Sequence, residues 1–111
     1  MLPKQNRLNL KKSFKWVLSG GKKESNNFKV FFKFSDNKLP LVGVAISSKV
    51  FKTAVFRNKA KRKSFKAIEK TYPLLQTGLN LVIMPKTGVL ELDQTLLDTE
   101  IEYVKDINNS N

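Results

Sequence analysis

Cysteine and histidine are both absent from the 111 residues of the chain. Because there is no cysteine, no disulfide can support the fold, and its stability must come from a packed core. Without either residue there is no ordinary nucleophile–base pair and no metal site built from thiolate or imidazole. The sequence therefore predicts no catalytic residues, and a reaction in which the chain takes part needs its chemistry supplied from elsewhere.

Long hydrophobic runs are missing as well. No window approaches the ~20 apolar residues that span a membrane, and the polar segment 1–12 lacks the apolar stretch of a signal peptide. We therefore expect a cytoplasmic protein that does not insert into a membrane.

Acidic residues are few and unevenly placed. The chain has 9 acidic and 21 basic side chains, a formal net charge of +12 and a pI near 10.1. Six of the nine acidic residues fall after residue 88, where only one lysine occurs. A surface this basic attracts polyanions such as nucleic acids, and we expect the acidic last segment to face away from such a partner.

The length and the 41% content of hydrophobic residues suit one compact α+β domain over 1–111, with residues 108–111 frayed. Hydrophobic periodicity and turn residues predict helices over 9–19, 54–71 and 93–107 and strands over 28–34, 40–47 and 79–84. A turn at 36–38 would join the strands 28–34 and 40–47 into a hairpin.

The predicted central helix is strongly basic. Its only acidic residue is Glu69, and its cations form a broad arc opposite an apolar one. Such an arc is often just a solvated face. Here, however, Arg57 and Lys61 fall on the apolar side, which indicates that the start of the helix projects past the core. Helix starts favour anions, so we predict that Arg57, Asn58 and Lys61 contact phosphates.

Phe31 lies between Lys29 and Lys33 on the polar face of the first predicted strand. It could stack on an unpaired base while the lysines hold phosphates, or it could be core covered by the first helix. Both hold if the helix covers only part of the sheet. Phe14 and Leu18 would then form the wall of a groove and Phe31 its floor, with Gly43, Ala45 and Ser47 leaving room for a nucleic-acid strand.

The stretch 42–62 resembles the signature of the bacterial ribonuclease P protein subunit. In that family a strand ending in Ser-Lys-Lys precedes an Ala-Val-x-Arg-Asn motif that opens the central helix, and here Ser47-Ser48-Lys49 precedes Ala54-Val55-Phe56-Arg57-Asn58. Asn6-Arg7-Leu8, Phe14, Val17 and Gly21 resemble the family's N-terminal pattern. Lys59 and Leu18 stand where the family commonly has arginine and an aromatic residue. The resemblance extends over about residues 4 to 105.

The resemblance implies an αβββαβα fold with a left-handed crossover, and an RNA-bound subunit of the ribonucleoprotein that removes the 5′ leader from precursor tRNA. The catalytic site would lie in the partner RNA, which holds Mg²⁺, and the protein alone would bind no metal. By matched position and charge, the residues expected to contact the catalytic RNA are Arg57, Asn58, Lys59, Lys61, Arg62 and Lys66, and those expected at the leader groove are Phe14, Leu18, Phe31, Lys29 and Lys33.

Two other interpretations compete with this one. A ribosomal or ribosome-assembly protein would use the same basic helix against ribosomal RNA. A free-standing metal nuclease would need convergent acids, for which Asp98 and Glu102 on one helix face are the candidates. Such a pair is more often a solvated face than a two-metal site.

Overall fold

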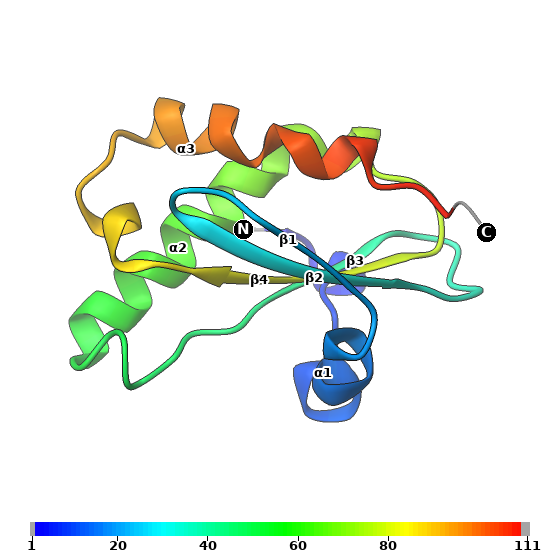
Figure 1. Cartoon of the computed structure of the whole chain (residues 1–111), viewed down its shortest axis with the longest axis horizontal. Coiled ribbons are helices and arrows are strands. Elements are labelled where there is room, and N and C mark those ends of the chain that lie inside the picture. Colours follow the sequence, from blue (N-terminus) through cyan, green and yellow to red (C-terminus); the bar gives the residue numbers. More distant parts are fainter. Residues whose placement is uncertain (1, 110–111) are drawn as a thin grey trace.

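A computed structural model describes residues 2–109, and its elements follow the order αβββαβα (Figure 1). This order is the one that the family resemblance implied. The elements are α1 (Leu10–Leu18), β1 (Gly21–Glu24), β2 (Phe28–Phe34), β3 (Leu41–Val44), α2 (Ala54–Thr71), β4 (Leu79–Pro85) and α3 (Gln94–Glu100), with short 3₁₀ helices at Lys4–Asn6, Tyr72–Leu74, Thr87–Leu90 and Ile101–Asp106.

The four strands form one mixed sheet in the order β1-β2-β4-β3. β2 is antiparallel to both β1 and β4, whereas β3 runs parallel to β4. The predicted hairpin between 28–34 and 40–47 is therefore wrong. β4 lies between those two strands because six of its seven residues are buried, which requires cover on both faces and neighbours on both sides. The left-handed sense of the crossover from β3 through α2 to β4 stays a prediction.

β1 was not expected from its own residues. Its sequence Gly-Lys-Lys-Glu has no apolar alternation, and only its first residue is even half-buried. It forms because its backbone pairs with β2, with Gly21 opposite Phe32 and Glu24 opposite Lys29. A polar edge strand of this kind gives no hydrophobic signal, and only the family resemblance implied a third strand before the central helix.

The central helix has the predicted bounds. The Thr53 hydroxyl accepts a hydrogen bond from the Phe56 backbone N–H at 3.2 Å and caps its start, and Tyr72-Pro73 follows its end. The last predicted helix, 93–107, is α-helical only over Gln94–Glu100 and continues as a 3₁₀ helix. Ile101, Val104 and Ile107 are buried at intervals of three residues, the repeat of a 3₁₀ helix.

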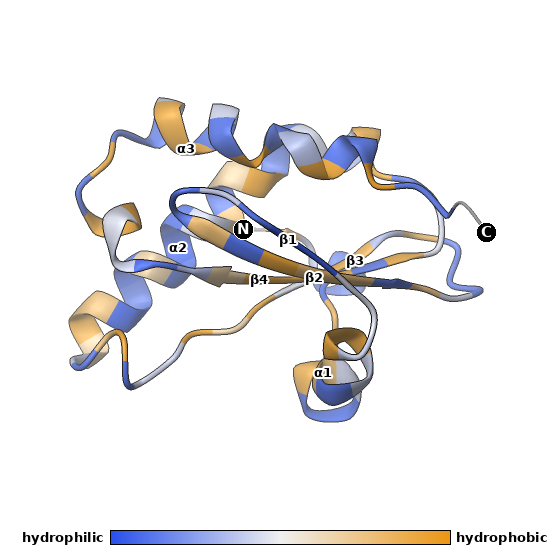
Figure 2. Cartoon of the chain, viewed as in Figure 1, coloured by the Kyte–Doolittle hydropathy of each residue, from blue (hydrophilic) through white to orange (hydrophobic). Residues whose placement is uncertain are grey.

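The helices lie on both faces of the sheet. α2 and α3 cover one face and α1 alone lies against the other (Figure 1). The first face holds the main core, whereas only Leu8, Val17 and Val82 are buried in the cluster on the α1 face. The two faces therefore differ strongly in how much apolar surface they bury. Figure 2 shows a separate contrast between strands, since β4 is mainly hydrophobic and β1 is hydrophilic.

The turn between β1 and β2 is tied to α3 through Glu100. The Glu100 carboxylate accepts hydrogen bonds from the Ser25 hydroxyl at 2.6 Å, from the Asn27 backbone N–H at 2.6 Å and from the Asn27 side-chain amide at 2.7 Å. Burial raises the pKa of the Glu100 carboxyl, but these hydrogen bonds outweigh burial and hold the pKa below its ordinary value of 4.5. The acidic last segment thus has a structural role, because it holds the turn between β1 and β2 in place.

At the end of the described part, the Asn109 backbone N–H donates to the Gln76 side-chain oxygen at 2.7 Å. The rest of the predicted frayed tail, 110–111, lies outside the described residues. Within residues 2–109 no helix is both long enough and apolar enough to cross a membrane.

Candidate nucleic-acid interface

The start of α2 projects beyond the core, as its charge pattern predicted. None of the side chains over 54–59 is buried, and burial begins at Ala60. Two apolar residues here are largely exposed, Val55 at 73% and Phe56 at 48%. The exposed polar residues on this helix include five of the six predicted RNA contacts, namely Asn58, Lys59, Lys61, Arg62 and Lys66.

Arg57, the sixth predicted contact, is half-buried. Its guanidinium donates a hydrogen bond to the Phe51 carbonyl at 3.0 Å, and the Phe51 side chain is itself buried. A guanidinium has five N–H donors, so this bond uses only part of its capacity. Arg57 therefore holds the 47–53 connection against the helix start, in addition to any contact with a polyanion.

Two other cations of α2 face α3 instead. Lys63 is half-buried and donates to the Leu92 carbonyl, and burial together with nearby Lys59 lowers its pKa, against the raising effect of Asp93. Lys70 forms an ion pair with Asp98 at 3.6 Å. Both contacts fasten α2 to the last segment, but only Lys63 is withdrawn from the surface, because the Lys70 side chain stays 77% exposed.

Asp98, one of the two acids considered for a metal nuclease, is buried and also accepts a hydrogen bond from Gln94 at 2.9 Å. Glu102, by contrast, is exposed. Among residues 2–109, no three or more His, Cys, Asp or Glu side chains come together where they could hold a metal ion. The surroundings of Asp98 are those of a structural residue between two helices.

On the other face of the sheet, Phe31 packs with Val17 and Val82 but is only half-buried. The Lys22 ammonium lies 6.0 Å from the centre of its ring. Phe31 is thus core only in part, and stacking of its accessible part on a base stays a prediction. The other partly exposed apolar residues of this cluster are Leu10, Phe14, Leu18, Leu41, Ala45 and Met84.

The two lysines that flank Phe31 have different surroundings. The Lys33 ammonium lies 5.1 Å from the centre of the Trp16 ring and donates to the Ser19 hydroxyl at 2.8 Å, so α1 holds it in place. Lys29 pairs across the sheet with Glu24 on β1 and Met84 on β4, and it lies toward the other end of the strand. Lys29 therefore differs from Lys33, because it makes neither of these contacts with Trp16 and Ser19.

The space expected at Gly43 is filled. Gly43 is buried, and a Cβ atom added to it would lie 2.8 Å from the Leu10 side chain. Leu10 therefore occupies the room that we predicted for a nucleic-acid strand at this position. Ala45 and Ser47, further along the same segment, are half-buried.

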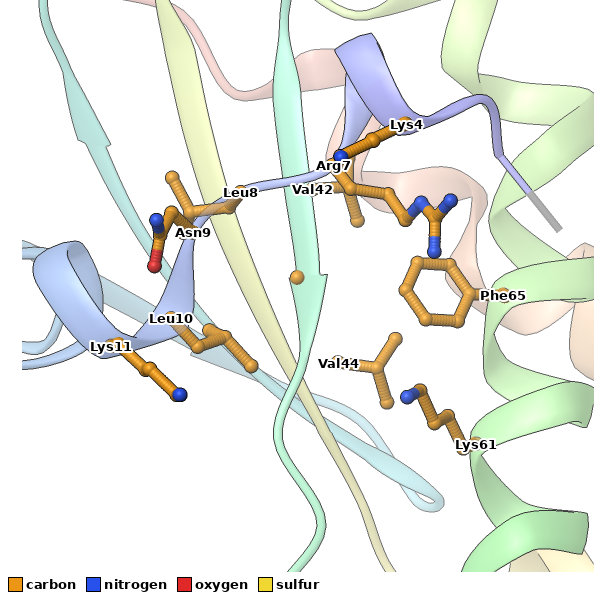
Figure 3. Close-up of a pocket in the computed structure, with 11 residues that line it drawn as sticks. Lys4, Arg7, Leu8, Asn9, Leu10, Lys11, Val42, Val44, Lys61 and Phe65 are labelled. Atoms are coloured by element: carbon orange, nitrogen blue, oxygen red, sulfur yellow. The ribbon is translucent and has the colours of Figure 1, made fainter.

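A cleft of about 450 Å³ lies between the segment 4–11 and α2, over the edge strand β3 (Figure 3). Its floor is apolar, and cations from both sides line its rim. The sequence analysis missed this site because its two sides lie some 50 residues apart in the chain and share no periodic pattern. The described residues that line the cleft are Lys4, Arg7, Leu8, Asn9, Leu10, Lys11, Val42, Gly43, Val44, Lys61 and Phe65.

The fold and the exposed cations define a small basic α+β domain suited to a polyanionic partner. A sequence model of the ribonuclease P family matches residues 2–107, and this chain belongs to the ribonuclease P protein family. It is therefore a protein subunit of an endoribonuclease ribonucleoprotein of tRNA processing and associates with ribonuclease P RNA. This favours the first of the interpretations given above.

Individual relatives agree. The ribonuclease P protein component of Picosynechococcus sp. is 32% identical over 93 residues, which cover 83% of this chain and 80% of that protein. The component of Rippkaea orientalis is 34% identical over 96 residues, covering 81% and 76%. Among solved structures, the protein from Thermotoga maritima superimposes with a TM-score of 0.81 at 21% identity over 93% of this chain and 98% of its own. That from Staphylococcus aureus has a TM-score of 0.75 at 16% identity, over 91% and 93%.

Proposed function

We propose that this chain binds ribonuclease P RNA through the exposed face of α2 and the 5′ leader of precursor tRNA along the α1 face of the sheet. The observation that carries the proposal is the exposure of Lys59, Lys61 and Arg62 on one helix, on which Lys63 is instead half-buried and bonded to Leu92. Cations that make no structural contact of that kind are available to neutralise phosphates, and such neutralisation dominates the affinity of proteins for nucleic acids.

The leader would lie beside α1. An unpaired strand is bound by aromatic rings that stack on bases and by cations that follow its backbone. The half-buried Phe31 supplies the ring, Phe14 and Leu18 supply apolar contacts from α1, and Lys29 supplies a cation on the same side of the sheet. Because Lys33 is held by Trp16 and Ser19, we assign it to positioning α1 more than to the leader.

We propose that hydrolysis takes place in the partner RNA, and Mg²⁺ held by that RNA would supply the metal chemistry. The contribution of this chain is to hold the substrate in register and to reduce the repulsion between two RNA molecules. Substrate positioning of this kind can supply a large part of a rate enhancement.

The test is cleavage of a 5′-labelled precursor tRNA by the purified protein alone, by ribonuclease P RNA alone at low Mg²⁺, and by both together. We expect cleavage at the mature 5′ end only in the combined reaction. Cleavage by the protein alone would contradict the assignment of catalysis to the RNA. If the protein does not stimulate the RNA, the proposed role in substrate positioning is wrong.

A further inference from the structure

α1 depends on the sheet for its position. It is nine residues long and lies alone on its face of the sheet (Figure 1), and one of its nine side chains, Val17, is buried. A helix this short is not stable by itself in water, so contacts with the sheet must hold it. Because Phe14 and Leu18 project from α1, its position decides where the apolar wall of the proposed leader groove lies.

The start of α1 is fixed against the edge strand β3. The Leu8 backbone N–H donates to the Val42 carbonyl at 2.9 Å. Leu10 packs over Gly43, where an added Cβ atom would lie 2.8 Å from the Leu10 side chain. These contacts hold the first turn of α1, and its last turn is held by a different strand, β2, which lies two positions away from β3 in the sheet.

Lys33 on β2 supplies the attachment at this last turn. Its ammonium lies 5.1 Å from the centre of the Trp16 ring and donates to the Ser19 hydroxyl at 2.8 Å. That hydroxyl in turn donates to the Trp16 carbonyl at 2.6 Å. Carbonyls in the last turn carry the negative end of the helix dipole, so a cation beside them is stabilising. We call Trp16, Ser19 and Lys33 the α1 clamp.

The α1 clamp is not part of the groove wall. Two residues along an α-helix differ by about 200° around its axis, so Trp16 points away from both Phe14 and Leu18. Trp16 belongs to neither buried cluster, and its 38% exposure leaves the ring open to the Lys33 cation. The clamp therefore acts on the proposed groove through the helix.

We propose that Trp16, Ser19 and Lys33 are positioning residues. They fix the end of α1, and with it the placement of Phe14 and Leu18 over the sheet, without touching the leader. The inference rests on the proposed leader site and deepens it, because it names the side chains that give the groove its shape. Loss of the clamp should loosen α1 and weaken the preference for precursor tRNA, although no contact with RNA is removed.

The first experiment measures amide hydrogen exchange, which reports local opening, in the free full chain without RNA. Lys33→Met removes the cation and should make the amides of Val17 and Leu18 exchange roughly threefold faster, the factor expected for one cation–π contact at an exposed site. Lys33→Arg keeps a cation that can stack on the indole and should restore slow exchange. Lys29→Met is the matched control, because Lys29 lies on the same face of β2 outside the clamp. Unchanged exchange in Lys33→Met, or equal effects of the two methionine variants, would overturn the inference.

The second experiment separates positioning from contact with the leader. The affinities of the reconstituted complex with ribonuclease P RNA for precursor and mature tRNA are measured over a series of salt concentrations. Lys33→Met should reduce the preference for precursor roughly threefold and leave the salt slope unchanged, because no phosphate contact is lost. Lys29→Met should instead lower the slope by about one. A slope lowered by about one in Lys33→Met would show that Lys33 contacts the leader, against the inference.

Trp16 completes the test, because its substitution changes no charge. Trp16→Leu should lower the preference for precursor as Lys33→Met does, and the double variant should lose no more than either single variant, since both remove the same contact. Additive losses would refute the clamp. If Phe31→Ala leaves the preference unchanged while Lys33→Met still speeds exchange in α1, the leader assignment is wrong and the attachment of α1 is supported. The two failures are therefore distinguishable.

Discussion

The two faces of the sheet are built differently although they share the same strands. On the α2 and α3 face, large side chains such as Phe28, Leu81 and Ile83 are fully buried in one continuous core. On the α1 face, Val17 and Val82 are buried but Phe14 and Phe31 remain half-exposed. The first face thus provides most of the stability, which leaves the second free to keep apolar and aromatic surface available for a ligand.

The largest effect should come from the closed face. Leu81→Ala removes a fully buried side chain and should lower the free energy of unfolding by about 3 kcal/mol. Leu18→Ala, on the half-exposed α1 face, should cost about 1 kcal/mol. Chemical denaturation of both variants measures the difference, and similar losses would contradict the division between the two faces.

The second largest loss of stability is expected from substitution of Glu100. Glu100→Gln weakens three hydrogen bonds to a charged acceptor and should cost about 1–2 kcal/mol at neutral pH. Since the folded pKa of Glu100 lies below 4.5, its contribution is present above that pH and is lost as the pH falls through the lowered value. Denaturation at pH 7 and pH 3 should therefore show a smaller gap between the variant and the unmodified protein at pH 3.

Phe31 tests the open face. Phe31→Ala should reduce affinity for precursor tRNA by roughly tenfold, the order of one lost stacking contact, with a smaller loss for mature tRNA. Phe32→Ala is the matched control, because Phe32 is also half-buried on β2 but packs on the opposite face. The control should lower stability without changing the preference for precursor. Equal losses on both tRNAs for Phe31→Ala would remove the leader assignment.

The smallest effect separates the cations of α2. Arg62→Ala should weaken binding to ribonuclease P RNA a few-fold and reduce the slope of log affinity against log salt by about one. Arg57→Ala should change the slope in the same direction, with an added loss of stability from its bond to Phe51. Lys63→Ala should leave the slope unchanged, because its ammonium faces Leu92. If Arg62 and Lys63 gave the same slope, the distinction between exposed and structural cations would be wrong.

Elements with strong local signals could be predicted from the sequence. The predicted bounds of α2, 54–71, agree with the structure, where the ends are set locally: Thr53 caps the start and Pro73 follows the end. The partner of each strand could not be predicted. β1 carries no hydrophobic pattern, and the order β2-β4-β3 depends on burial of β4 from both faces, which is a property of the assembled layers.

The same distinction between local signals and contacts of distant segments applies to the candidate nucleic-acid interface. Exposure of Lys59 and Arg62 could be inferred from the helical arc, whereas the sequence left open whether Phe31 is exposed or covered by the first helix, and the structure shows it half-buried. The interactions of Lys63 with Leu92 and of Lys33 with Trp16 depend on contacts between distant segments. The same is true of the cation-lined cleft, since nothing near Lys61 in the sequence indicates that the segment 4–11 lies opposite to it.

The bridge between Arg7 and Val42 also bears on self-association. β3 is an edge strand of the sheet, and an open edge invites pairing with the edge of another molecule. The Leu8 N–H occupies the Val42 carbonyl, so the segment that lines the cleft also shields this edge. At the opposite edge, β1 is short and carries Lys22 and Lys23, whose charges repel a second copy. Both edges of the sheet are thereby protected against pairing with a strand of another copy. The chain can therefore expose a large basic surface before it binds RNA without aggregating through its sheet edges.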